Sequence, residues 1–350
     1  MKFIKNFSLT IISLFLSLLI LEVFLVYFMP QARNSSWRVQ DESGSFFNIQ
    51  NGKAQHEFIG KKEKISVNYK FGEFHNRIYK NFETVDIAKK KILILGDSNI
   101  FGWLLEDDET FVLQLQELFN KYYFVNASAG GWSDVDMYNY LKKNCSKVEP
   151  EFIILFLEID RSISTNAIYF DKEKKLNFKK IPVNNLKKYL NNKYLYNFLS
   201  ENSHLFQIIK TLYVNLSNEN YINFVKKNNT NTKKVEKKIN NKIDYNQKLD
   251  LFFELINLIQ YEAEKCKSNI IYIDRGWYKK KQNSKIKNLV FEKFYNLKLK
   301  NEINFISLYH KMSGLRIDIN KYLLEEGHPN SKANKYKFKI LAKELKNYLL

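Results

Sequence analysis

Short, unbroken runs of apolar residues recur along the chain, and turn residues end most of them. Such runs are typical of strands that are buried on both faces, as in a parallel sheet. Five are predicted, and helical patterns alternate with them. We therefore expect an α/β domain over residues 89–350, with three α/β/α layers around a flavodoxin-like parallel sheet of about five strands. The predicted strands are 91–95, 122–126, 152–157, 269–273 and 304–308.

Capping residues place the ends of several helices in this domain. The acidic residues 107–109 precede an apolar stripe, and acidic side chains favour a helix N-terminus. Ser133 is expected to cap a helix that reaches about Lys143. Two more helices are predicted, at 246–265 and from Pro329 to the C-terminus. Right-handed crossovers would then bring the carboxyl ends of all the strands to one edge of the sheet.

The N-terminal segment predicts a single membrane anchor. Residues 7–29 are almost entirely apolar, and about 20 such residues form a helix that spans the hydrocarbon core of a bilayer. A secretory signal has a shorter apolar region and a cleavage site of small residues, which residues 31–33 do not supply. We expect an uncleaved transmembrane helix in the inner or cytoplasmic membrane. Residues 1–6 would then form a cytoplasmic tail.

Charges near this anchor suggest its orientation. Lys2 and Lys5 precede the apolar stretch and favour a cytoplasmic N-terminus, although Arg33 and Arg38 follow closely and weaken the asymmetry. The main domain would then be periplasmic or extracellular. Glu22 inside the anchor marks either a partner helix in the membrane or an acid near the outer interface, and we favour the second.

Two further segments flank the predicted sheet. Residues 30–88 form a polar stalk followed by a strand segment, and the alternation at 64–80 predicts a strand or hairpin. His75 in this segment is expected to be structural. Residues 162–245 lack the sheet pattern and are rich in Lys and Asn, so we expect a helical insertion or lid with a solvated linker.

Composition excludes several function classes. The formal net charge is +19, but the lysines are scattered among asparagines rather than gathered with stacking aromatics, so we expect no nucleic-acid partner. An electrostatic preference for anionic lipid or acidic glycan stays open. Cys145 and Cys266 fit no metal spacing, and the sequence does not decide whether they pair. With five histidines and no Cys/His cluster, no metal site is expected.

Polar residues at two turns could carry nucleophilic chemistry. Ser98 follows the first predicted strand, where open α/β sheets place their ligands. His328 stands in a turn before the final helix, because Pro329 cannot continue a preceding helix. An acid three residues earlier, Glu325, could fold back onto its Nδ1 through the turn that Gly327 permits. A serine, a histidine base and an orienting carboxylate form the set that acyl transfer requires.

Together these motifs resemble the SGNH/GDSL esterase–lipase superfamily, in particular its membrane-anchored bacterial members that act on acyl groups of glycans or lipids. The resemblance covers residues 89–160 and 268–350. It rests on the segments Gly96–Trp103, Asn126–Gly131, His328–Asn330 and, before them, Phe71–Arg77.

The resemblance implies a role for several residues. Ser98 matches the nucleophile, and its backbone N–H would be one oxyanion donor. Gly131 would supply the second donor. His328 matches the general base, oriented by Glu325 where the family has aspartate. Asn99 is included in the expected oxyanion and binding set.

Asp160 departs from the family pattern, because the family usually has an asparagine there that donates to the oxyanion. An ionised aspartate cannot donate, and Arg161 beside it favours ionisation. A protonated Asp160 could donate only with a strongly raised pKa. A shift of one residue in the match is the third possibility.

The expected function is therefore a serine O-acyl esterase or transacylase that acts on acylated cell-surface glycan or a lipid-linked saccharide. This chemistry needs no metal or organic cofactor. The alternative is a catalytically degenerate domain that binds glycan or an envelope assembly partner beside the membrane, and Asp160 favours it. Trp103 and Trp132 could form a sugar-stacking wall, although core packing is the simpler role.

Overall fold

The computed structural model describes residues 2–82, 89–157, 168–171, 173, 175–178, 189–191, 193–228, 245–276, 284–312 and 320–350. The chain divides into two compact units. The first contains Met1–Ser36, Ala54–Val67 and Tyr189–Lys242, and the second contains Trp37–Lys53, Asn68–Lys188 and Ile243–Leu350. The predicted α/β domain lies in the second unit, and each unit is described below by itself.

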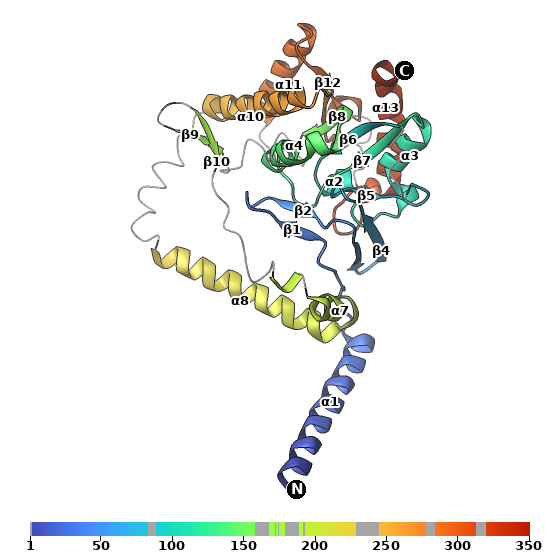
Figure 1. Ribbon diagram of the computed structural model, residues 1–350, viewed down its shortest axis with the longest axis vertical. Coiled ribbons are helices and arrows are strands. Elements are labelled where there is room, and N and C mark those ends of the chain that lie inside the picture. The colour runs from blue at the N-terminus through green and yellow to red at the C-terminus, as the bar shows by residue number, and fades with distance from the viewer. Residues whose placement is uncertain are drawn as a thin grey trace. The chain divides into compact units, whose positions relative to one another are not determined.

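A mostly parallel sheet organises the second unit (Figure 1). Its five parallel strands are those that the sequence predicts, and they lie in the order β12-β11-β8-β6-β7. Numbered along the chain, this is the flavodoxin-like order 2-1-3-4-5. The strands are β6 (Lys90–Leu95), β7 (Tyr122–Asn126), β8 (Pro150–Leu157), β11 (Asn269–Asp274) and β12 (Asn304–Ile306).

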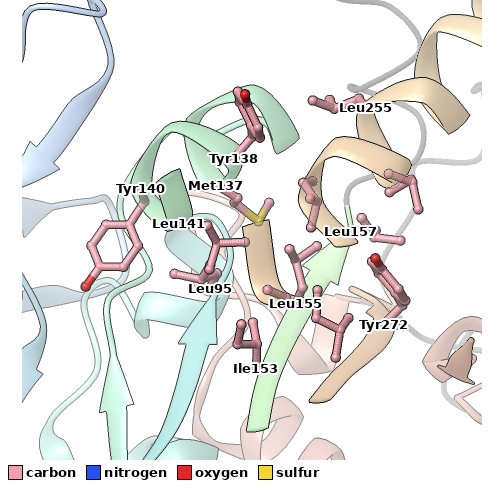
Figure 2. Packing of buried hydrophobic residues seen from close by; sticks show 14 of the residues in the cluster. Leu95, Met137, Tyr138, Tyr140, Leu141, Ile153, Leu155, Leu157, Leu255 and Tyr272 are labelled. Atoms are coloured by element: carbon pink, nitrogen blue, oxygen red, sulfur yellow. The ribbon is translucent and has the colours of Figure 1, made fainter. Parts of the chain in front are cut away.

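Helices cover both faces of this sheet and make the predicted three layers. On one face, α4 (Asp134–Val148), α10 (Tyr245–Lys265) and α11 (Ser284–Leu299) pack on side chains such as Leu95 and Leu155 (Figure 2). On the other face, α3 (Phe111–Leu118) and α13 (Ser331–Leu349) pack on Ile94 and Phe156. Each buried strand supplies both layers because its side chains alternate between the faces.

Local capping explains where the helices begin. Thr110 accepts from the N–H of Leu113 at the start of α3, after the short helix η1 (Asp107–Glu109). Ser133 forms a capping box with Asp136 at the start of α4, as the sequence predicts for Ser133. Asn330 caps α13, and Ser307 caps the short helix α12 (Leu308–Lys311), so the last strand ends two residues earlier than expected.

The segment expected to be a stalk contains strands instead. The hairpin of β1 (Arg38–Gln40) and β2 (Phe46–Asn48) belongs to the second unit, and β3 (Lys53–Ile59) follows it. Trp37 and Phe47 are buried, so large aromatic side chains fix this stretch to the core although most of its residues are polar. The predicted hairpin at 64–80 is present as β4 (Lys64–Phe71) and β5 (Arg77–Ile78), which pairs antiparallel with β7.

The described parts of the predicted insertion are divided between the two units. The hairpin of β9 (Ile168–Phe170) and β10 (Leu176–Phe178) belongs to the second unit, where Phe178 stacks on Tyr138 of α4 with ring centroids 5.1 Å apart. Helices α7 (Tyr194–Asn202) and α8 (His204–Asn228) belong to the first unit. The described parts of this segment therefore do not form a single compact unit.

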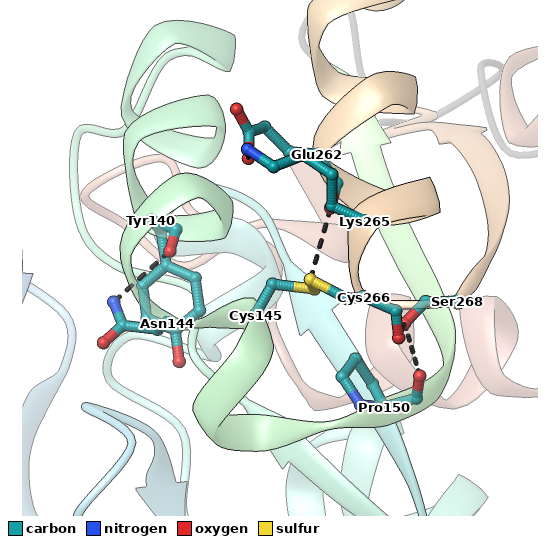
Figure 3. Close-up of a disulfide and its surroundings, with 8 residues drawn as sticks. All are labelled: Tyr140, Asn144, Cys145, Pro150, Glu262, Lys265, Cys266 and Ser268. Atoms are coloured by element: carbon teal, nitrogen blue, oxygen red, sulfur yellow. Dashed lines mark hydrogen bonds and ion pairs between the residues drawn. A yellow bond between two sulfur atoms is a disulfide. The ribbon is translucent and has the colours of Figure 1, made fainter.

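Cys145 of α4 and Cys266, directly after α10, form a disulfide in the second unit (Figure 3). Their Cα atoms lie 6.0 Å apart, and the bond joins two helices on the same face of the sheet. The pairing that the sequence leaves open is therefore made in this structure.

The first unit contains α1 (Lys2–Phe28), whose apolar side chains are almost all exposed. By length and composition, Phe3–Phe28 could cross a membrane. Near its end, the carboxylate of Glu22 accepts hydrogen bonds from Ser203 Oγ at 2.8 Å and from the backbone N–H of His204 at 2.6 Å. Glu22 thus caps α8 within this unit.

Arg77 ties β5 to the loop that follows the Ser98 turn. Its fully buried guanidinium donates to the carbonyls of Gly102 and Leu105, both at 2.8 Å, and to the carboxylate of Asp107 at 2.8 Å. It also lies over the ring of Tyr69, 4.8 Å from the centroid. Arg77 is therefore a buried donor to several backbone carbonyls of this loop and to Asp107.

The variant Arg77→Met should lower the free energy of unfolding by about 3 kcal/mol, because it leaves buried acceptors without a donor. Urea unfolding would measure the loss as a lower midpoint at an unchanged slope. The control is Lys90→Met, which removes an exposed ion pair with Glu151 and should leave the midpoint unchanged. Equal midpoints for Arg77→Met and the parent would contradict the assignment.

Candidate active site

Ser98 lies at the topological switch point of the sheet. It follows β6, whose neighbours β7 and β8 are reached by crossovers in opposite directions. Asp97 caps the short helix α2 (Ser98–Phe101) by accepting from the N–H of Asn99 at 2.9 Å. Gly96 is required here, because a Cβ would stand 2.4 Å from the side chain of Ile100. The strand, the glycine and the cap together present a half-buried Ser98 at the carboxyl edge of the sheet.

The structure brings Ser98 and His328 together across 230 residues of sequence. Ser98 Oγ lies 2.8 Å from His328 Nε2, within hydrogen-bond distance. His328 Nδ1 lies 2.6 Å from Oε2 of Glu326, and the backbone N–H of His328 donates to the other carboxylate oxygen at 3.0 Å. A hydroxyl, an imidazole and a carboxylate are thus connected in series, which is the geometry of an activated nucleophile.

The acid in this series is Glu326 and not Glu325, which corrects the expectation from sequence. Gly327 has a φ of +100°, and this left-handed turn folds the Glu326 carboxylate back onto both the ring and the backbone of His328. Glu325 has an exposed side chain. Spacing shows that an acid precedes the histidine, but the turn decides which of two adjacent acids reaches it.

Gly131 lies in the loop after β7, the strand beside β6. The N–H of Ala129 donates to the carbonyl of Gly96 at 3.2 Å, so this loop is tied to the turn that carries Ser98. Gly131 has a φ of +78°. The N–H group of Ser98 lies in the first turn of α2, where N–H groups lack intrahelical acceptors. It and the N–H group of Gly131 remain the proposed oxyanion donors.

Arg38 holds the peptide that contains the Gly131 N–H. Its guanidinium donates to the carbonyl of Gly130 from β1 and lies over the rings of Trp37 and Phe46, each 5.5 Å from the centroid. In a planar trans peptide the N–H points opposite to the carbonyl. Arg38 therefore orients the Gly131 N–H away from itself. Burial lowers the pKa of this guanidinium below its usual value.

The other residues expected to contact substrate are Asn99, Asp160, Trp103 and Trp132. The side-chain amide of Asn99 donates to Asp97 Oδ2 at 2.7 Å, so here it supports the turn. Asp160 lies outside the described residues. Trp132 is buried and donates to the carbonyl of Phe46, which confirms core packing for it. Trp103 is only half-buried, and its ring stands edge-on to His328 with centroids 4.7 Å apart.

A cluster of buried charges lies behind the Ser98 turn. Arg275, directly after β11, pairs with Asp97 at 3.2 Å. Complete burial lowers the pKa of Lys337 of α13 to about 8, while the negative charge of Asp97 opposes that shift. Complete burial also raises the pKa of Asp274 to about 6, although Asp274 accepts from the N–H groups of Gly276 and Tyr309 at 2.9 Å. The carboxylate of Asp97 thus faces fixed positive charge.

Glu326, Arg38 and Arg275 also belong to this region, although the sequence does not indicate them. Arg38 and Arg275 have no local signal, because each contacts a turn that is remote in sequence. Glu326 had the same signal as its neighbour Glu325. Among the residues that the structure describes, no group of three or more His, Cys, Asp or Glu side chains could hold a metal ion.

No family model and no curated protein matches this chain. Solved structures that it is similar to include a psychrotrophic esterase EstA from Pseudoalteromonas sp., with 12% identity and a TM-score of 0.42 over 75% of this chain and 99% of that one. Another is a putative lipolytic protein of the G-D-S-L family from Desulfitobacterium hafniense, with 14% identity and a TM-score of 0.39 over 72% and 100% of the two chains. A third is the acetyl xylan esterase AlAXEase, with 11% identity and a TM-score of 0.42 over 73% and 99%. All three are described as esterases or lipolytic proteins.

Proposed function

We propose that this chain is a membrane-anchored serine O-acyl esterase or transacylase of the SGNH type. The observation that carries the proposal is the series Ser98–His328–Glu326, with a serine Oγ to imidazole distance of 2.8 Å and an imidazole to carboxylate distance of 2.6 Å. Its position at the switch point of a flavodoxin-like sheet supports the same interpretation.

The proposed reaction uses only groups of the chain. Ser98 Oγ attacks the acyl carbonyl while its proton passes to His328 Nε2, and Glu326 stabilises the imidazolium. The oxyanion is held by the N–H groups of Ser98 and Gly131. His328 then protonates the departing alkoxide, which leaves an acyl-enzyme. Water, or the hydroxyl of an acceptor, attacks the acyl-enzyme and gives its proton to His328. The bond from the acyl carbon to Ser98 Oγ then breaks, His328 returns the proton to Oγ, and the free acid or the acylated acceptor leaves.

The proposed substrate is an acylated cell-surface glycan or lipid-linked saccharide. The resemblance to membrane-anchored members of the superfamily supports this substrate class, and Trp103 beside His328 offers an aromatic surface for a sugar ring. α1 would anchor the chain in the inner or cytoplasmic membrane with the main domain outside the cytoplasm. The disulfide between Cys145 and Cys266 supports that orientation, because disulfides persist in oxidising compartments.

Labelling of the purified full chain with a fluorophosphonate probe tests the proposal. We expect one covalent adduct, on the peptide that contains Ser98, because the probe reports an activated serine. Prior incubation with an O-acetylated polysaccharide should release acetate and slow the labelling. A folded protein that takes no label, or takes it on another serine, would overturn the enzyme proposal and favour the glycan-binding alternative.

The same preparation can separate esterase from transacylase. With an O-acetylated donor and an excess of a free oligosaccharide acceptor, a transacylase transfers acetyl groups to the acceptor faster than it releases acetate. An esterase releases acetate at a rate that the acceptor does not change. Mass spectrometry of the acceptor and an acetate assay would measure the two products.

A further inference from the structure

Helix α8 departs from an ordinary helix of a soluble domain over residues 204–216, because it buries polar side chains in its first turns and leaves large apolar ones exposed. Such a helix normally buries its apolar face and exposes its polar one. Here the side chains of His204 and Gln207 are buried, at 7% and 6% exposure. The apolar residues Ile209, Leu212 and Leu216 are 53%, 55% and 59% exposed. Their spacing places these three on one face of the helix.

Polar contacts inside the first unit hold α8 by its polar face. His204 Nδ1 accepts from the N–H of Gln31 at 2.8 Å, and Gln207 donates to the carbonyl of Ser200. Lys210 donates to the carbonyl of Asn34 at 3.2 Å. These hydrogen bonds fix the rotation of the first turns of α8. The side chains of Ile209, Leu212 and Leu216 therefore point away from the contacts that hold the helix.

The preceding helix of the same unit also exposes apolar side chains. Tyr194, Leu195 and Phe198 of α7 are 83%, 65% and 48% exposed. Large exposed apolar patches are sites of contact with a protein or a membrane. We call the exposed apolar side chains of α7 and of α8 up to Leu216 the α7–α8 apolar face.

The attachment of α8 to α1 indicates which partner covers this face. Glu22 of α1 accepts from Ser203 Oγ and from the N–H groups of His204 and Leu205, so the start of α8 is fixed to α1 at that level. At about 1.5 Å per residue, the stretch from Phe3 to Glu22 is about 30 Å long. This matches the ~30 Å hydrocarbon core of a bilayer.

We infer that the α7–α8 apolar face lies on the bilayer surface and forms a second membrane contact beside α1. With α1 across the bilayer, Glu22 reaches the outer boundary of the hydrocarbon, and α8 leaves this end of α1 and runs across its direction (Figure 1). An apolar helix face at that depth is solvated by lipid, as in interfacial helices. The positive net charge of +19 complements anionic headgroups. The inference rests on the proposed anchoring by α1, and it keeps Glu22 near the outer interface while it adds the hydrogen bonds by which Glu22 joins the two helices.

Single cysteines carrying an environment-sensitive fluorophore on the full chain test this arrangement, because the native cysteines form a disulfide. The chain is reconstituted in vesicles of phosphatidylcholine and phosphatidylglycerol that contain a lipid with a nitroxide near its headgroup. Labels at Leu212→Cys and Leu216→Cys should show blue-shifted emission and lose fluorescence to the nitroxide. The matched control is Thr211→Cys, which is exposed on another face of the same turn and should be quenched by aqueous iodide instead.

A reference label at Leu14→Cys in α1 separates this inference from the proposed anchor. One outcome is that a nitroxide deep in the bilayer quenches Leu14→Cys, whereas only iodide quenches Leu212→Cys and Leu216→Cys. That outcome would overturn the surface contact and leave the proposed anchor in place. No lipid quenching at Leu14→Cys would overturn both. A third outcome is energy transfer between labels at Leu212→Cys on different copies, together with protection from both quenchers. It would show that a second copy covers the α7–α8 apolar face, and it would also overturn the inference.

Discussion

Replacing Ser98 with alanine is expected to lower the hydrolysis of an activated acyl ester about 10⁴–10⁶-fold, because it removes the atom that would carry the acyl group. The residual rate would come from the oxyanion donors and from binding. His328→Ala should produce a loss of similar size, since His328 Nε2, 2.8 Å away, is the base that takes the proton of Ser98 Oγ. Steady-state kinetics with a p-nitrophenyl ester would measure kcat/KM for each variant.

The double variant Ser98→Ala/His328→Ala provides the sharper form of this experiment. Residues that act as one unit are strongly non-additive, so the double variant should be no slower than either single variant. The control is Ser43→Ala, which changes an exposed serine in the turn between β1 and β2 and should keep the parental rate. Losses that multiply in the double variant would show that Ser98 and His328 act separately.

The parallel strands of the sheet could be predicted because they are buried on both faces. Continuous apolar runs such as 91–95 and 152–157 have no other simple interpretation when helical patterns separate them. The position of Ser98 followed from the same pattern, since the end of a parallel strand fixes the edge on which its turn lies. These features depend on local sequence, which is why they were confirmed.

The features that could not be predicted depend on contacts between distant segments. β1 and β2 are short, and only Trp37 and Phe47 among polar neighbours indicate that the segment is fixed to a core. Arg38 and Arg275 each contact a turn from another part of the chain. The α7–α8 apolar face is defined by which side chains are exposed, and sequence periodicity cannot tell which face of a helix is covered.

The sequence predicts Glu325 as the acid beside His328, and the structure has Glu326 there instead. Glu326→Gln should lower kcat/KM about 10²–10⁴-fold, because the amide no longer stabilises the imidazolium and no longer fixes the proton on Nδ1. Glu325→Gln makes the same chemical change one residue away, on an exposed side chain, and should leave the rate within about twofold of the parent, as expected for a surface position.

The two glutamine variants make the same change in size and in charge at adjacent positions, so each serves as the reference for the other. The difference reports the hydrogen bond in which Glu326 Oε2 accepts from His328 Nδ1. Urea midpoints would verify that both variants fold equally well. If Glu325→Gln lost most of its activity and Glu326→Gln stayed active, the orienting acid would be Glu325, three residues before His328. That result would also mean that the turn at Gly327 changes when substrate binds, since its present φ of +100° brings Glu326 to the ring.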